Sequence, residues 1–204
     1  MADISTKYLG LKLQSPVIVG SSGLTSSVEN VIEYEKQGAG AVVLKSLFEE
    51  QILHEVRHTL GQDSITNQYP EAFDYISNFS RSNNLDKYMA LIRDCRKSVG
   101  IPVIASINCA TDAEWTSYAK KIEDAGANAL ELNIFVLPSD PANSPEQLEN
   151  VYFNILEKVV KQVRIPVALK ISSYFSGLAS YAQKFAWAGA KGRLEISGLV
   201  SCRW

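Results

Sequence analysis

Apolar residues along the 204-residue chain recur in short runs, separated by longer polar and amphipathic stretches, and two phrases alternate. In the first phrase a proline opens an apolar run, as in SPVIVGS (15–21), IPVIASIN (101–108) and IPVALKIS (165–172). In the second, Gly-Ala follows a helix-like stretch and leads into an apolar run, as in YEKQGAGAVVLKS (34–46), IEDAGANALELNI (122–134) and FAWAGAKGRLEIS (185–197). Such repetition predicts a fold built from one recurring supersecondary unit.

The spacing between the two phrases is nearly constant, which leaves room for one strand and one helix in each interval. It is 22 residues from Pro16 to Gly38, 24 from Pro102 to Gly126 and 23 from Pro166 to Gly189. The apolar runs are near-continuous, as in parallel strands that are covered on both faces. We expect six strand-helix units, with strands near 16–21, 41–46, 102–108, 129–134, 166–172 and 192–197.

Amphipathic helices are expected between the two phrases of each pair, because apolar residues recur there at helical spacing. The residues that form these apolar faces are Val28, Val31, Ile32 and Tyr34, then Trp115, Tyr118, Ala119 and Ile122, then Leu178, Tyr181, Phe185 and Ala186. The glycine after each helix can take the left-handed conformation that ends a helix. The proline that opens each following strand costs nothing there, since a first strand residue need not donate to the ladder.

Two architectures suit these units, a doubly wound open sheet and an eight-fold barrel. No GxGxxG follows the first strand, and polar residues end the strands, so the sequence predicts an α/β fold: an incomplete TIM (β/α)8-type barrel of about six units. We treat residues 1–204 as a single, partial domain. The alternating stretch TKYLGLKLQ (6–14) predicts an N-terminal hairpin that plugs the barrel, or else a loose arm. The long connection 47–84 predicts a functional loop or an insert.

Polar residues stand where the predicted strands end: Ser21, Ser22, Lys45, Ser46, Asn108, Asn133 and Lys170. Ligand sites of β/α barrels lie at the carboxyl ends of the strands, so we expect these side chains to share one rim. An unpaired lysine is costly to bury, and two lysines with two asparagines favour a site over solvated strand ends. Such a site suits an organic cofactor or a phosphorylated substrate. A desolvated Lys170 or Lys45 could instead form a Schiff base.

Composition narrows the classes of function. The net charge is −2 without a basic stripe, so neither nucleic acid nor a membrane surface is expected as a partner. No apolar run reaches about 18 residues, and the N-terminal stretch does not resemble a signal peptide. Cys95, Cys109 and Cys202 lack CxxC spacing, which favours a reducing, cytoplasmic compartment. His54 and His58 have no carboxylate at metal-ligand spacing, so no metal is expected.

These residues resemble motifs of the dihydroorotate dehydrogenase family, in order, from about residue 5 to about residue 192. TKYLGLKLQSPVIVGSSGLT resembles the hairpin, first strand and flavin-contacting turn, and AVVLKS, ELNI and IPVALKISSYF resemble the second, fourth and fifth strands. The resemblance implies an FMN cofactor and a small-molecule substrate.

The roles that the resemblance implies fall on the strand-end residues. Gly20, Ser21 and Ser22 would approach the FMN, Lys45 and Ser46 would hold its ring on the substrate side, Asn133 would bridge flavin and substrate, and Lys170 would stabilise negative charge near flavin N1. Lys45 is thereby also a candidate catalytic residue, and Asn108 joins the cofactor-binding set by its position.

Three departures from the family pattern stand out. The family usually has a Ser-Cys-Pro-Asn-like run after the fourth-strand asparagine, with Cys or Ser as the base. Here NIFVLPSDP places Phe135, Val136 and Leu137 in that region, so Ser139 is the nearest candidate hydroxyl. The family's substrate-binding asparagine loop has no clear counterpart in 59–76. The tail 193–204 keeps no family pattern, where two further units would grip the FMN phosphate.

We therefore expect a C-terminally truncated, FMN-dependent oxidoreductase that acts on the CH-CH group of dihydroorotate or a similar small substrate, in pyrimidine biosynthesis. By itself the chain is expected to bind FMN poorly, to be marginally stable, and to self-associate or form a homodimer through unpaired strand edges. Two alternatives stay open, a Schiff-base lyase or aldolase barrel and a non-catalytic truncated fragment.

Overall fold

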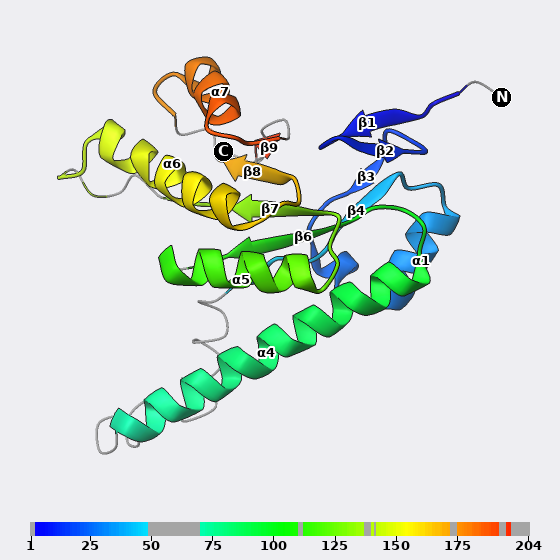
Figure 1. Cartoon of the computed structure of the whole chain (residues 1–204), viewed down its shortest axis with the longest axis horizontal. Helices are drawn as coiled ribbons and strands as arrows, with labels where there is room; N and C mark the ends of the chain where they lie inside the picture. The colour runs from blue at the N-terminus through cyan, green and yellow to red at the C-terminus, as the bar shows by residue number, and fades with distance from the viewer. Residues whose placement is uncertain are drawn as a thin grey trace, which may run out of the picture.

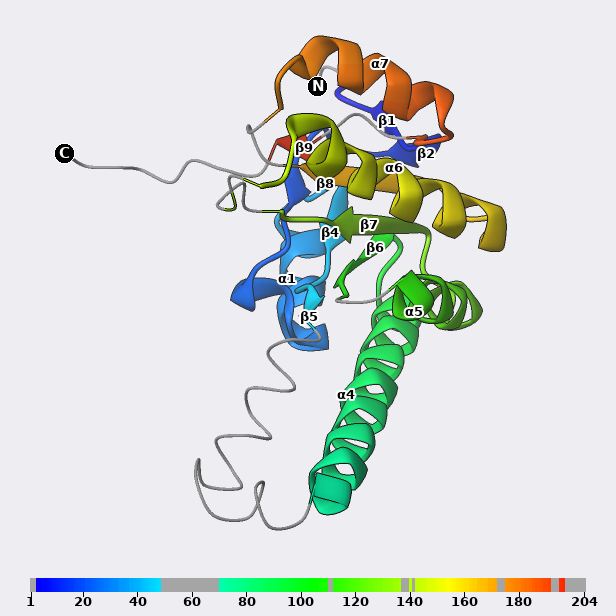
Figure 2. The same ribbon diagram turned by 90° about the vertical axis from the view of Figure 1, so that its left-hand side faces the viewer.

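A computed structural model describes residues 3–48, 70–109, 112–136, 140, 142–171, 175–191 and 195–196. Its centre is a curved parallel sheet in the order β3 (Ile18–Val19), β4 (Ala41–Val43), β6 (Val103–Asn108), β7 (Ala129–Asn133), β8 (Val167–Ile171) and β9 (Glu195–Ile196), with β5 (Leu47–Phe48) also paired to β6. The six predicted strands are therefore present and adjacent in chain order. The predicted incomplete barrel is confirmed as a parallel half-barrel (Figures 1 and 2).

A separate antiparallel hairpin covers the amino ends of these strands. It consists of β1 (Thr6–Tyr8) and β2 (Leu11–Leu13), joined at Leu9 and Gly10, both with positive φ, as two-residue hairpin turns require. Leu9 and Leu13 are buried on the inner face of the sheet against Ala41, Val43, Ile104, Ala129 and Ala168. The hairpin prediction is thus confirmed and the loose arm is wrong, because the three alanines leave space that the two leucines fill.

Five helices cover the outer face of the sheet in the described ranges (Figure 1). They are α1 (Val28–Lys36), α4 (Pro70–Ser98), α5 (Asp112–Asp124), α6 (Pro145–Gln162) and α7 (Leu178–Trp187). The main core lies between helices and sheet, where Ile92, Ile122, Leu156 and Phe185 pack with the outward-facing strand residues. The sheet is thus apolar on both faces at its amino-end half, as the near-continuous apolar runs predict.

The repeated glycines end helices as expected. Gly38, Gly126 and Gly189 have φ of 91°, 93° and 107°, which a side chain would strain. The repeat also contains a conserved spacing between a carboxylate and the helix-ending glycine, in two of its three copies. Three residues before the glycine, Glu35 accepts hydrogen bonds from the N–H groups of Gly100 and Ile101 (2.7 and 3.1 Å). In the equivalent place Glu123 accepts from Arg164 and Ile165 (2.6 and 3.3 Å).

These carboxylates connect the two repeated phrases. Each lies at the end of one helix and binds the backbone directly before the proline of a Pro-led strand, Pro102 or Pro166. The N–H groups ahead of a strand have no ladder partner, so the carboxylate satisfies them. The third repeat has Ala186 at this position and lacks the device.

The second predicted strand and the connection after it need correction. The expected strand 41–46 is interrupted after Val43, and its continuation β5 pairs with β6 further along. The stretch 47–84 is not one long connection, since β5 opens it and α4 begins at Pro70. Residues 49–69, with His54, His58 and most of the region 59–76, lie outside the described part of the chain.

Candidate functional site

Polar side chains replace apolar ones on the inner face of the sheet toward the carboxyl ends of the strands. Along β6 the inward positions are Ile104, Ser106 and Asn108; along β7 they are Ala129, Glu131 and Asn133; along β8 they are Ala168 and Lys170. The period of two in a strand explains this sorting. Parallel pairing in register then brings these residues together, since Ser106 lies opposite Glu131 and Asn133 lies opposite Lys170.

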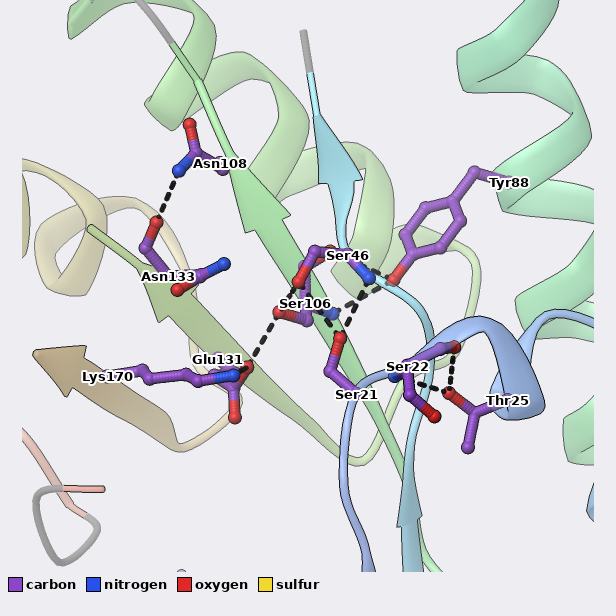
Figure 3. Close-up of polar contacts among 10 residues, drawn as sticks. All are labelled: Ser21, Ser22, Thr25, Ser46, Tyr88, Ser106, Asn108, Glu131, Asn133 and Lys170. Carbon is purple, nitrogen blue, oxygen red and sulfur yellow. Dashed lines mark hydrogen bonds and ion pairs between the residues drawn. The ribbon is translucent and has the colours of Figure 1, made fainter. Parts of the chain in front are cut away.

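A row of three serine hydroxyls joins the first three parallel strands (Figure 3). The Ser21 hydroxyl lies 3.0 Å from the Ser46 hydroxyl and accepts a hydrogen bond from the Ser46 N–H at 2.9 Å. The Ser46 hydroxyl lies 2.6 Å from that of Ser106. Ser46 and Ser106 are buried, whereas Ser21 is partly exposed. Two predicted site residues, Ser21 and Ser46, are therefore in direct contact.

The row of serines ends on a buried ion pair. Ser106 donates to Oε1 of Glu131 at 2.8 Å, and the same oxygen lies 3.7 Å from Nζ of Lys170. The side chain of Glu131 is 3% exposed and that of Lys170 is 19% exposed. The carboxylate therefore lies behind the ammonium, which is the more accessible member of the pair. Lys170, predicted from its strand-end position, is thus a partly exposed lysine with a buried carboxylate as its partner.

The two predicted asparagines lie at the ends of neighbouring strands. The Asn108 side-chain amide donates to the backbone carbonyl of Asn133 at 2.8 Å, which ties the end of β6 to the end of β7 (Figure 3). Both side chains are partly exposed at this edge of the sheet. Asn133 pairs in register with Lys170, so its amide stands beside the lysine.

The turn after β3 contains the remaining predicted residues. Ser22 caps the short 3-10 helix η1 (Gly23–Thr25), and its hydroxyl accepts from the Leu24 N–H at 3.3 Å. Gly20 is exposed, and a Cβ built on it would have no heavy atom within 4 Å, so the backbone there is open to a ligand. The side chain of Lys45 is exposed, and the backbone N–H of Lys45 donates to the Thr25 carbonyl at 3.2 Å.

The interruption between β4 and β5 has a physical explanation that involves Tyr88 of α4. Where the strand departs from the ladder, Ser106 loses its backbone partners on that side. The Tyr88 hydroxyl replaces them, because it accepts from the Ser106 N–H at 2.9 Å and donates to the Ser106 carbonyl at 3.0 Å. Burial raises the pKa of Tyr88 well above its usual value, so the phenol stays a donor. The tyrosine thereby fixes Ser106 from the outer face.

Sequence reasoning missed Ser106, Glu131 and Tyr88. The first two carry a readable signal, because each is a polar residue inside an apolar strand, in VIASIN and ALELN. Tyr88 has no such signal, since a tyrosine in an amphipathic helix reads as ordinary core. Several predictions concern residues outside the described ranges: Leu137, Ser139, Cys202 and all of the tail 193–204 except Glu195 and Ile196.

A cavity lies at the opposite end of the sheet. It is a cavity of about 480 Å³ between the hairpin, the end of α6 and the start of β8, lined among others by Leu9, Leu11, Val163, Arg164 and Lys191. Its polar lining comes from exposed basic side chains, with no buried polar side chain among the residues named.

Among the described helices, none combines the length and apolar character needed to cross a membrane.

The half-barrel and its polar carboxyl-end edge define a class of protein. It is a parallel β/α-barrel-type fold, a class in which ligand sites generally lie at the carboxyl ends of the strands. Solved structures agree on the fold. An IMP dehydrogenase/GMP reductase-like protein from Corynebacterium glutamicum matches with a TM-score of 0.50 and 14% identity, over 97% of this chain and 61% of that one. A putative dihydrodipicolinate synthetase from Pseudomonas aeruginosa also has a TM-score of 0.50 and 14% identity. That match covers 86% of this chain and 53% of that one.

Sequence comparisons narrow the class, although no family model matches the chain. A putative dihydroorotate dehydrogenase A (fumarate) from Aeropyrum pernix is 28% identical over 97% of this chain and 62% of its own length. The catalytic subunit of dihydroorotate dehydrogenase B (NAD(+)) from Thermoplasma acidophilum is 27% identical over 90% of this chain and 59% of its own length. The NAD-dependent dihydropyrimidine dehydrogenase subunit PreA from Escherichia coli is 22% identical over 98% of this chain and 49% of its own length.

The chain is thus distantly homologous to the dihydroorotate dehydrogenases, as its motifs indicate. It spans about 60% of the length of these dihydroorotate dehydrogenase relatives.

Proposed function

We propose that this chain provides the ring-binding part of an FMN-dependent oxidoreductase that oxidises dihydroorotate or a similar small substrate, in pyrimidine metabolism. The observation that carries the proposal is the position of Lys170, a partly exposed lysine paired with a buried carboxylate and adjacent to Asn133 at the carboxyl ends of the strands. The distant homology to dihydroorotate dehydrogenases supports the choice of reaction.

The donor set at this edge fits the ring system of FMN. A flavin ring offers hydrogen-bond acceptors along one edge, and that edge gains negative charge on reduction, so it requires a nearby cation. Lys170 supplies the cation, Asn133 supplies an amide, and the turn at Gly20 and Ser21 leaves backbone open to a planar ligand. When bound, FMN supplies the hydride-accepting chemistry, and the protein supplies orientation and electrostatics.

The division of labour among the other residues follows from their contacts. Ser46 and Asn108 hold neighbouring strand ends in place, since the hydroxyl of one and the amide of the other are engaged within the protein. Lys45 has an exposed side chain and is proposed to face the substrate. Phe135 and Val136 follow Asn133 and cannot take a proton, so Ser139 remains the proposed acceptor for the substrate proton.

Titration of FMN into the purified chain tests the proposal. We expect saturable quenching of flavin fluorescence with a weak Kd, between about 1 µM and 1 mM. Lys170→Gln should weaken binding about tenfold, the effect of losing one hydrogen bond to a charged group. Asn133→Ala is a second variant that leaves the Glu131–Lys170 pair intact. Lys161→Ala, which removes an exposed lysine from α6, is the matched control and should leave Kd unchanged.

Anaerobic addition of dihydroorotate to the FMN-loaded chain then tests the substrate. Bleaching of the visible flavin absorbance is expected with dihydroorotate or with a related dihydropyrimidine. Unsaturable FMN binding, or binding that is equally strong in Lys170→Gln and Asn133→Ala, would show that the ligand does not use this edge of the sheet.

A further inference from the structure

Phe135 is a phenylalanine that the fold leaves 55% exposed, two residues beyond Asn133 at the end of β7. Trp187, the last residue of α7, is 76% exposed. Single apolar side chains are common on protein surfaces, so exposure by itself indicates little. Phe135 differs from Trp187 in its position, because it continues the strand whose last residue, Asn133, lies in register with Lys170.

The side chain of Phe135 faces the same side of the sheet as that of Asn133. Its neighbours Ile134 and Val136 both pack into the core between helices and sheet, whereas Phe135 is in neither apolar cluster. Alternate side chains of an extended chain face opposite sides, so Phe135 is the next inward position after Glu131 and Asn133. Toward the carboxyl end, the inward positions of β7 thus change from a buried carboxylate to an amide and then to a phenyl ring. Two residues of extended chain place the ring about 7 Å beyond the amide.

Hydrogen bonds hold the backbone on both sides of Phe135. The Asn133 carbonyl accepts from the Asn108 side-chain amide at 2.8 Å (Figure 3). The Val136 N–H donates to the Tyr152 hydroxyl at 3.2 Å, and Tyr152 is a buried residue of α6. The phenyl ring is therefore carried by a fixed backbone, so a ligand that packs against it need not order this segment.

The end of β7 favours an uncharged group over a charged one. Ile134, Phe135 and Val136 are all apolar, so a charge placed against them would lose hydration without gaining a partner. Lys45 follows β4, which β6 separates from β7, so the backbone of Lys45 starts about 10 Å away. A flat ring, by contrast, gains apolar contact and stacking from a phenyl group.

The amide of Asn133 adds hydrogen-bonding capacity beside this apolar surface. An asparagine side chain offers both a donor and an acceptor, which complement the C=O and the N–H of a cyclic amide. Together, Asn133 and Phe135 fit an uncharged, flat nitrogen heterocycle.

We propose that Phe135 is a specificity-determining residue on the substrate side, whose ring packs against such a heterocycle and disfavours a charged substituent at the end of β7. This inference rests on the proposed function and deepens it by naming the substrate class. The preferred substrate is a pyrimidine-type ring without a carboxylate, and dihydroorotate itself is a poorer one.

Uracil and orotate, two flat rings that differ by one carboxylate, are the probes that test the inference. Titrations followed by ligand-observed NMR give both Kd values for the wild-type chain, with saturating FMN and without it. We expect uracil to bind about tenfold more tightly than orotate, since the carboxylate would lose hydration against the phenyl ring. Phe135→Ala should weaken uracil binding about tenfold and reduce the preference, because it removes the stacking and the apolar contact.

Two further variants separate contact with the ligand from effects on the fold. Phe135→Tyr keeps an aromatic ring and should retain the wild-type affinity for uracil. Trp187→Ala removes an exposed aromatic side chain from the end of α7 and should leave both affinities unchanged. Substitutions at exposed positions rarely alter stability, so Phe135→Ala should unfold at the same denaturant concentration as wild type.

Orotate binding as tight as that of uracil would overturn the inference. Equal uracil affinities in wild type and Phe135→Ala, or no uracil binding at all, would overturn it too. A chain that fails to bind FMN would refute the proposed function instead, and the uracil affinities measured without FMN would still decide the role of Phe135.

Discussion

At the scale of single residues, the candidate site depends on polar atoms that satisfy one another inside an apolar fold. Ser106 shows this most clearly. Its hydroxyl donates to Glu131 on the inner face, while its backbone N–H and carbonyl bind the Tyr88 hydroxyl on the outer face. The hydroxyl also contacts the Ser46 hydroxyl at 2.6 Å, whereas the backbone groups are bound by the Tyr88 hydroxyl at the break between β4 and β5. The cost of removing the Tyr88 hydroxyl is therefore the cost of buried backbone groups left unpaired.

Tyr88→Phe should destabilise the chain by about 1 to 3 kcal/mol, because it leaves the N–H and the carbonyl of Ser106 without a partner. Urea unfolding followed by circular dichroism measures the difference. Tyr34→Phe is the matched control: its hydroxyl donates to the Leu24 carbonyl at 3.4 Å on the surface, and its loss should cost less than about 0.5 kcal/mol. Equal stabilities of the two variants would show that Tyr88 does not support the strand break.

At the scale of elements, the repeated unit is held together by more than its apolar pattern. Glu35 and Glu123 connect the ends of α1 and α5 to the backbone that precedes β6 and β8. Because these strands carry Ser106 and Lys170, the carboxylates help to set the register on which the site depends. The Lys120 ammonium, and with it the N–H groups of Arg164 and Ile165, hold the pKa of Glu123 below its usual value.

Glu123→Gln should therefore destabilise the chain by about 1 kcal/mol at neutral pH, since charge-assisted hydrogen bonds become neutral ones. A carboxyl whose pKa is depressed in the folded state stabilises the fold above its unfolded pKa, and this contribution disappears as the pH falls through the folded value. The difference in the free energy of unfolding between wild type and variant should thus disappear as the pH falls. Denaturant curves measured from pH 7 to pH 3 test this. Glu157→Gln, at an exposed position, is the control. A stability difference that does not change with pH, or one that is equally large for Glu157→Gln, would show that the Glu123 carboxylate does not stabilise the fold.

How far the sequence predicts these elements depends on the range of the interactions that form them. The six strands follow from local apolar runs, and the helix ends at Gly38 and Gly126 follow from glycine's conformational freedom. The break after Val43 could not be predicted, because it is stabilised by Tyr88, a residue 45 positions further along the chain. Among site residues, strand ends identify Lys170 and Asn133, whereas Glu131 becomes evident only when the register brings it beside Ser106.

At the scale of the whole molecule, the sheet separates two ends with different chemistry. Its amino end is closed by the hairpin through Leu9 and Leu13. Its carboxyl end carries the row of three serine hydroxyls, the two asparagines and Lys170. Within the described residues β3 and β9 are the outer strands of an open sheet. The expected self-association or homodimer, and the single partial domain, stay predictions. The central claim is that a flavin binds at the carboxyl end and not at the cavity beside the hairpin.

Hydrogen-deuterium exchange with and without saturating FMN tests this claim most directly, because it locates the ligand along the chain even if the protein self-associates. We expect slower exchange in peptides that contain the turn around Ser21 and the ends of β7 and β8, at Asn133 and Lys170. Slower exchange around Leu11, Arg164 and Lys191 instead, at the cavity beside the hairpin, would contradict it.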